Sequence, residues 1–192
     1  MPRKPAYDRD LLIDRARDIF WRKGWAGTSL KDLERALDLR TGSFYAAFGS
    51  KDALYELALD RYAEDGVARL RALADKHGAL EALRRHPRWI VENCAAAAKA
   101  CMLSKTLLEL HAQNNPLSDH ASAHLTRMEA LFAELFRLAQ YAGEIGTDHD
   151  PAQLARRYQS DLLGLRVSAE RPNVNASALA DDLAADLDRL RP

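Results

Sequence analysis

Two cysteines and a pair of histidines are the residues whose types and spacing could support chemistry in this chain. Cys101 is predicted at a helix start, with Lys99 and Lys105 nearby. A helix N-terminus and neighbouring cations both favour a thiolate, which attacks electrophiles and oxidants. One hypothesis is that Cys101 senses such a molecule, with Cys94 as a second thiol. The alternative is that Cys101 is simply a small buried apolar side chain.

His120 and His124 are four residues apart, a spacing that can hold a metal ion on one helix face, and Asp119 is adjacent in sequence. No third or fourth ligand is evident nearby, so we favour solvated histidines and expect no metal and no other cofactor. We do not expect catalysis. The sequence has no glycine-rich phosphate loop, no G-x-S-x-G motif, and no carboxylate pair that stands out from the surface charge.

The elements that would position these residues are helices, and the predicted fold class is all-α with about nine of them. Beyond Gly78 only helical periods of apolar residues occur. Pro87 is expected to bend or restart its helix. The predicted helices span residues 8–23, 29–37, 40–48, 52–76, 79–94, 101–113, 117–142, 151–171 and 176–190.

Helix start and stop signals are clearest near the N-terminus. Asp8 can cap the first helix, and Gly24 can end it. Ser29 and Asp32 have the spacing of a capping box at the start of a short second helix. Asp38 follows that helix at a sharp turn, where aspartate tolerates the left-handed conformation better than most residues. The pattern predicts a helix–turn–helix.

Composition is that of an ordinary globular protein: 192 residues, 47% hydrophobic and 29% charged, with a formal net charge of zero. Residues 1–55 nevertheless contain 11 Lys and Arg against 8 Asp and Glu, which hints at an anionic partner for this end of the chain. No apolar run approaches the ~20 residues of a membrane-spanning helix, and the N-terminus lacks a signal-peptide core. We therefore expect a cytoplasmic protein that does not bind membranes.

A family pattern runs through residues 8–60, at Ile19, Phe20, Gly24, Thr28, Ser29, Leu30, Leu33, Ala36, Gly42, Ser43, Phe44, Tyr45, Phe48, Ser50, Lys51, Asp52, Ala53 and Leu54. Through these residues the sequence resembles the TetR/AcrR family of transcriptional repressors. Later, residues 101–109 look like the start of the sixth helix in many members. Asp38 replaces the usual glycine of the turn, Arg40 replaces the usual Ser or Thr cap, and Ala46 and Ala47 replace an aromatic or His pair.

The resemblance implies an N-terminal helix–turn–helix DNA-binding domain (1–51) and a C-terminal helical effector-binding and dimerisation domain (52–192). It implies a homodimer, formed through the last two helices, that binds double-stranded operator DNA and leaves it when a small-molecule effector binds. Helix 52–76 would transmit the effect of ligand binding from the pocket to the DNA-binding domain. The expected DNA-binding residues are Thr28, Ser29, Arg40, Thr41, Gly42, Ser43, Tyr45 and Lys51.

The effector itself is not identified by the sequence. The residues expected to line its pocket are Tyr62, Trp89, Cys94, Cys101, Met102, Leu108, His111, Met128 and Phe132. Leucines and a tyrosine of the last two helices are expected at the dimer interface, with burial inside the same chain as the alternative. The alternative function is a helical ligand-binding or thiol-reactive protein that does not bind DNA.

Overall fold

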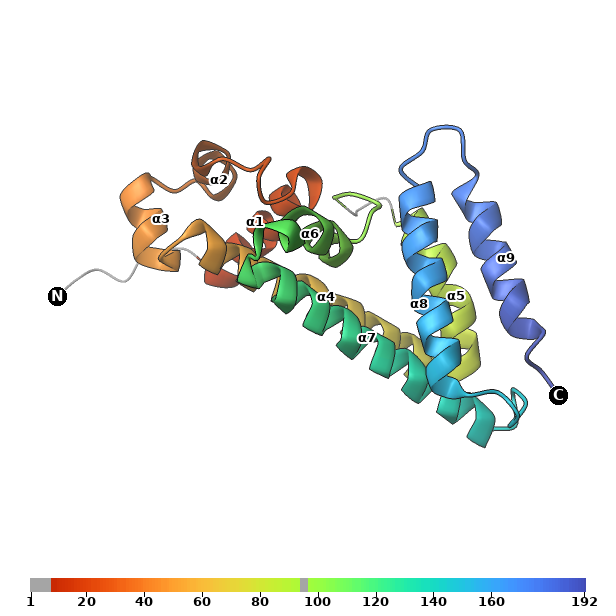
Figure 1. The fold of residues 1–192 in the computed structure, drawn as a ribbon. Coiled ribbons are helices and arrows are strands. Elements are labelled where there is room, and N and C mark those ends of the chain that lie inside the picture. Colours follow the sequence, from red (N-terminus) through yellow and green to blue (C-terminus); the bar gives the residue numbers. More distant parts are fainter. Residues whose placement is uncertain (1–7, 94–96) are drawn as a thin grey trace.

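Two long helices, α4 (Lys51–His77) and α7 (Pro116–Tyr141), lie side by side and form the spine of the computed structural model, which describes residues 8–93 and 97–192 (Figure 1). At one end lie α1 (Arg9–Lys23), α2 (Leu30–Leu37), α3 (Thr41–Phe48), α6 (Met102–Leu110) and the short helix η1 (His111–Gln113). At the other end lie α5 (Ala79–Glu92), α8 (Pro151–Ser168) and α9 (Ala176–Asp188). The prediction of an all-α fold is confirmed. None of the helices in the described ranges has the length and apolarity required to cross a bilayer.

The predicted caps are present at the N-terminal helices. The Asp8 carboxylate accepts from the backbone N–H of Asp10 at 3.0 Å. Ser29 and Asp32 form a reciprocal capping box at the start of α2. Asp38 ends α2 in the left-handed conformation, with φ 53° and ψ 44°. These caps fix the entry and exit angles of α2, and therefore the position of α3 behind it.

Helix α5 runs through Pro87, where a bend or a restart was predicted. A proline inside a helix cannot donate to the carbonyl four residues earlier, which here belongs to Leu83. That carbonyl accepts instead from the Tyr158 hydroxyl of α8, at 2.7 Å. A tertiary hydrogen bond thus satisfies the group that the proline leaves free.

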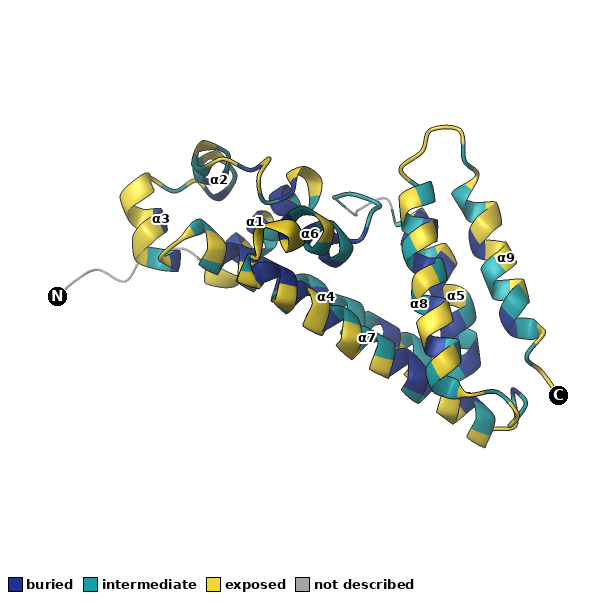
Figure 2. Ribbon diagram, viewed as in Figure 1, coloured by how far each residue is buried: buried dark blue, intermediate teal, exposed yellow. Residues whose placement is uncertain are grey.

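Buried apolar residues form two clusters, one at each end of the spine (Figure 2). The first joins α1, α2, α3 and the start of α4 to α6 and the start of α7. The second joins the far ends of α4 and α7 to α5, α8 and α9. The first cluster crosses the domain boundary expected after residue 51, because Cys101, Met102 and Leu103 belong to it. The N-terminal helices therefore share one buried core with the start of α6.

Several residues expected at a dimer interface are buried within the chain. Tyr158, Leu162, Leu165 and Leu187 are each less than 7% exposed in the second cluster. Helix α9 packs on α5 and α8. These contacts cover, within the chain, apolar residues of the last two helices that were expected at a dimer interface. Large apolar side chains that are exposed at this end of the molecule are Leu138, Tyr141, Val167 and Leu179.

Candidate nucleic-acid interface and cavity

Helix α3 presents a continuous polar and small-residue face to solvent. Phe44 and Phe48 are buried and hold the helix against the first cluster. The opposite face is exposed, as Figure 2 shows for most of this helix. Its exposed residues are Arg40, Thr41, Gly42, Ser43, Tyr45 and Ala46. Five of them belong to the set that the sequence predicted for DNA contact.

Gly42 is the smallest residue on this face. A Cβ built on it would meet no other atom within 4 Å, so no contact within the described residues requires a glycine there. An α-helix with side chains is about 10–12 Å in diameter, and the major groove of B-DNA is about 12 Å wide. A bare backbone at this position therefore permits close approach to a groove floor or wall.

The three other predicted DNA-contact residues differ in their exposure. Thr28 is fully buried, and its hydroxyl donates to the Gly24 carbonyl at 2.6 Å. Its hydroxyl folds back on the end of α1, so the expected phosphate contact does not fit this structure. Ser29 is exposed, but its hydroxyl is engaged in the capping box. Lys51 is half-buried at the start of α4.

The Lys51 ammonium lies over the Trp25 ring, 4.2 Å from its centroid. Partial burial lowers the pKa of Lys51, and the carboxylates of Asp52 and Glu109 oppose that shift. The Trp25 indole also donates to Asp52 at 2.8 Å, which fixes the ring. The ammonium is thereby held at the N-terminal end of α4, where helix amides also attract anions.

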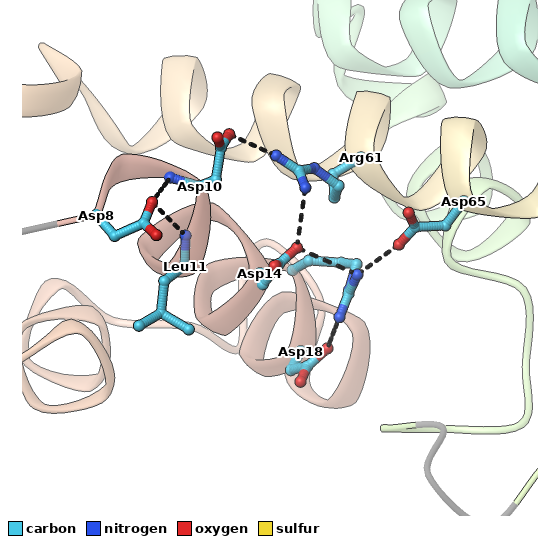
Figure 3. A network of polar contacts seen from close by, with 8 residues as sticks. Asp8, Asp10, Leu11, Asp14, Asp18, Arg61 and Asp65 are labelled. Carbon is cyan, nitrogen blue, oxygen red and sulfur yellow. Dashed lines mark hydrogen bonds and ion pairs between the residues drawn. The ribbon is translucent and has the colours of Figure 1, made fainter.

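Ion pairs join α1 to α4 (Figure 3). Arg61 on α4 contacts Asp10 at 2.6 Å and Asp14 at 3.6 Å. Arg17 on α1 contacts Asp65 on α4 at 2.6 Å. Arg17 also contacts Asp14 and Asp18 on its own helix. Because each arginine is shared among several carboxylates, this network keeps α1 in register along α4.

Helix α6 is bonded to the end of α1 and to the turn that follows it. The Lys105 ammonium donates to the backbone carbonyls of Trp21 at 2.7 Å and Arg22 at 3.3 Å. One turn later, the Glu109 carboxylate accepts from the backbone N–H groups of Trp25 at 3.0 Å and Ala26 at 2.7 Å. One side chain therefore satisfies carbonyls at the C-terminus of α1, and the other satisfies amides of the turn leading to α2.

A cavity of about 300 Å³ lies between α1, α4, α5, α7 and α8, next to the start of α6. Five of the residues predicted to line a pocket do so: Tyr62, Trp89, Cys101, Met128 and Phe132. Met102 is buried in the first cluster, and Leu108 and His111 are exposed, Leu108 to 82%. Those three lie outside the lining, because α6 turns a different face to the cavity. Cys94 lies outside the described residues.

The cavity wall combines apolar surface with charged side chains, among which Arg17 is paired with Asp18 and Asp65. Arg69 and Arg166 both line it, and neither forms an ion pair with a carboxylate of the described residues. Arg69 stacks on Trp89, with its guanidinium carbon 3.8 Å from the ring centroid. Burial lowers the pKa of Arg69, with Asp65 opposing and Arg166 adding to the shift. A partly desolvated cation of this kind favours an anionic ligand.

His86 adds an unpartnered polar atom to the same wall. Its ring is buried, and Nδ1 has no hydrogen-bond partner. Burial lowers the pKa of His86 to about 3, and the nearby Arg166 and Arg69 charges act in the same direction. A neutral imidazole with a free nitrogen can therefore exchange a hydrogen bond with a ligand in the cavity.

Comparison with known families decides the identity. Residues 12–58 match the family described as bacterial regulatory proteins, tetR family, and residues 66–170 match the tetracyclin repressor-like C-terminal domain. The chain belongs to the TetR family. This TetR-family protein is a DNA-binding transcriptional regulator. The prediction of such a regulator from the sequence is confirmed. The alternative of a ligand-binding protein that does not bind DNA is not supported by these matches.

Individual relatives of this TetR-family regulator match along most of its length. HTH-type transcriptional repressor ComR of Escherichia coli (strain K12) is 25% identical over 171 residues, which cover 87% of this chain and 81% of ComR. A cysteine-substituted variant of the TetR family transcriptional regulator CifR, solved with 26-bp double-strand operator DNA, is 30% identical with a TM-score of 0.79, covering 99% and 100% of the two chains. The reduced form of E. coli NemR shares the fold, with 17% identity, a TM-score of 0.81, and 95% and 96% coverage.

Cys101 of this TetR-family regulator is 7% exposed and caps α6 without a side-chain hydrogen bond from the helix. The two lysines expected to favour its thiolate are engaged elsewhere. The Lys99 ammonium donates to the Val91 and Asn93 carbonyls, and Lys105 donates to the end of α1. The sulfur lines the cavity all the same.

Sequence reasoning missed four residues that shape the cavity and its connection to α1: Arg69, His86, Glu109 and Arg166. Each is a charged or polar residue on an amphipathic helix, where such residues usually face solvent. Only the tertiary packing shows that they point inward. His86 carried a weak signal, because it directly precedes a proline inside an apolar helical stripe.

Proposed function

We propose that this TetR-family protein is a repressor that binds operator DNA as a homodimer and leaves it when a small organic anion fills the cavity. ComR, which carries the name repressor, and CifR, which has been solved with operator DNA, support the first part. In this proposal the protein acts by binding rather than by catalysis. Its compartment is the cytoplasm, where the chromosome lies.

The proposal rests on α6, which contacts both the cavity and the N-terminal helices. Cys101 and Leu103, at the start of α6, contribute to the cavity wall. Lys105 and Glu109, further along the helix, bond the end of α1 and the turn before α2. A ligand that displaces the start of α6 therefore acts on the helix–turn–helix through hydrogen bonds and buried contacts. Differential affinity for the two arrangements would shift the population away from the DNA-binding one.

The proposed DNA contacts fall into two groups. Tyr45 and Lys51 would bind backbone phosphates, which give affinity without sequence information. Arg40, Thr41 and Ser43 would approach base edges, with Gly42 permitting close contact. Thr41 is hydrogen bonded to Glu34 of α2 in the free protein, so it must exchange that partner to contact a base. Ser29 contributes by capping α2.

Operator binding is tested by mobility shift and footprinting with duplex DNA from the region upstream of the protein's own gene. We expect protection of a partly palindromic site, with affinity falling steeply as salt rises because phosphate contacts release counterions. Analytical ultracentrifugation of the same sample should give a dimer. Absence of any protection at low salt would contradict the proposed operator, and a monomer would contradict the dimer.

The ligand class gives a further prediction. In a panel of small aromatic carboxylates such as benzoate and naphthoate, each compared with its neutral carboxamide, we expect the acids to raise the thermal midpoint more. Arg69→Met should weaken carboxylate binding about 10- to 100-fold, since a hydrogen bond to a charged group is worth about 1.5–3 kcal/mol. Calorimetric titration measures the affinity. Arg71→Met is the matched control, because Arg71 is exposed on the same helix and pairs with Glu134 outside the cavity.

A second candidate effector is an electrophile, favoured by the position of Cys101 in the cavity wall. With an α,β-unsaturated carbonyl compound, the sulfur would bond the β-carbon as the carbon–carbon π bond breaks, and the thiol proton would pass to the α-carbon. Release from operator DNA by such a compound, with a matching mass increase, should then be absent in Cys101→Ser. Release that persists in this variant would leave the anion as the effector class.

A further inference from the structure

A carboxylate from α4 joins the two histidines of α7 in a cluster that the sequence did not reveal. The Asp60 Oδ1 atom lies 2.7 Å from His120 Nε2 and 2.8 Å from His124 Nε2. The two Nε2 atoms are 3.2 Å apart. His120 and His124 occupy successive turns of one helix face, as their spacing predicted, but the third ligand comes from a helix 60 residues away in sequence.

We propose that Asp60, His120 and His124 form a binding site for a divalent transition-metal ion, with Zn²⁺ as the type case. Two imidazoles and one carboxylate suit zinc and its first-row neighbours, and three protein ligands leave a position for water. The ligand atoms are the two Nε2 nitrogens and an Asp60 oxygen. This site is separate from the cavity, whose lining begins one residue later on α7 with Leu125.

The separations fit an ion at the centre of the cluster. Zinc bonds of about 2.0–2.1 Å at tetrahedral angles place ligand atoms about 3.3 Å apart. The three observed separations, 2.7, 2.8 and 3.2 Å, need only a small expansion to reach that value. Without an ion, both Nε2 atoms lie at hydrogen-bond distance from the same Asp60 oxygen and 3.2 Å from each other. An ion would be bound by three lone pairs directed at one point.

The surroundings also fit a metal centre. Glu56 lies one turn before Asp60 on α4, and its Oε1 is 3.7 Å from the other ring nitrogen of His120, Nδ1. A carboxylate on that side is the usual partner that orients a metal-bound imidazole. His124 is 6% exposed, whereas His120 and Asp60 are partly exposed, so the cluster is open to solvent on one side. An ion could therefore enter without unfolding the helices.

A bound ion would act on α4 and α7, the two long helices that form the spine of the molecule. Asp60 is nine residues along α4 from Lys51, a distance of about 13–14 Å at 1.5 Å per residue. An ion held by α4 and α7 together would fix the angle between these two helices close to the helix–turn–helix. An ion that binds only the folded chain would also raise the stability of the protein by mass action.

The test is calorimetric titration of tag-free, full-length protein with Zn²⁺, supported by the visible absorption of bound Co²⁺. We expect one ion per chain and a rise in thermal midpoint with Zn²⁺. His120→Gln and Asp60→Asn should each weaken binding about 100-fold or more and abolish the tetrahedral Co²⁺ spectrum. His111→Gln, which changes an exposed histidine outside the cluster, should bind like wild type.

The chosen variants alter partly exposed residues, so folding is checked by their metal-free thermal midpoints. If Asp60→Asn does not fold, His120→Gln decides the question. Absence of saturable binding by the wild-type chain would overturn the proposal. Equal zinc affinity in the wild type and in a folded cluster variant would overturn it as well, because the ion would then be bound elsewhere.

Discussion

Replacing Gly42 with leucine should abolish specific operator binding while leaving the folded chain at least as stable. Apart from the adjoining residues and the backbone of α3 itself, no atom lies within 4 Å of a Cβ at this position, and Gly42 is exposed, so the free protein has room for a side chain there. Leucine should even stabilise α3 by about 0.5–1 kcal/mol, because glycine costs conformational entropy in a helix. In the complex, however, four added carbons would stand between the helix backbone and the DNA. We expect a loss of affinity of about 100-fold or more, or about 2.7 kcal/mol.

Fluorescence anisotropy with labelled operator measures the affinity, and thermal unfolding measures the stability. Ala72→Leu is the matched control, because it adds a leucine at an exposed small residue of α4 far from α3 in sequence. The control should bind operator like wild type. An unchanged affinity in Gly42→Leu would show that the exposed face of α3 does not enter a groove.

Local signals in the sequence were sufficient to predict the helix–turn–helix. The Ser29 and Asp32 capping box, the left-handed Asp38 and the buried Phe44 all depend on residues within a few positions of each other. Such interactions are encoded by spacing alone, because helix geometry fixes which groups meet. Long helices were predicted for the same reason, with boundaries that differ from those observed by a few residues.

Residues that act across the fold were not predictable in this way. Thr28 looked available for a phosphate, but the turn after Gly24 directs its hydroxyl back to that residue's carbonyl. Leu108 looked like part of a pocket, yet the face of α6 that carries it is exposed. Periodicity identifies an apolar stripe without specifying what covers it. The same limit explains Leu187, which α5 and its neighbours cover within one chain.

Asp60 is the clearest example of information that only the tertiary structure supplies. On its own helix it resembles any other acidic residue of a solvated face. The packing of α4 against α7 brings it to His120 and His124, and converts two histidines of little significance into a three-ligand cluster. The role of Glu109 is likewise visible only in the tertiary structure, because its partners Trp25 and Ala26 lie more than 80 residues away in the chain.

Glu109 should accordingly be needed for the helix–turn–helix to hold its DNA-binding position. Glu109→Ala removes two hydrogen bonds from a carboxylate to the Trp25 and Ala26 amides. Each such bond is worth about 1.5–3 kcal/mol, so we expect the turn between α1 and α2 to lose roughly 3 kcal/mol of local stability. Amide hydrogen exchange at both residues should accelerate, and operator affinity should fall about tenfold or more.

Two further variants separate the hydrogen bonds from the charge and from general destabilisation. Glu109→Gln keeps one acceptor oxygen and should give an intermediate loss, whereas Glu64→Ala removes an exposed carboxylate of α4 and should change nothing. Gly24→Ala should resemble Glu109→Ala, because its Cβ would approach a Glu109 carboxylate oxygen to 2.8 Å at a residue with φ of 77°. If Glu109→Ala kept wild-type amide protection and operator affinity, α6 could not be the element through which the cavity acts on the DNA-binding helices.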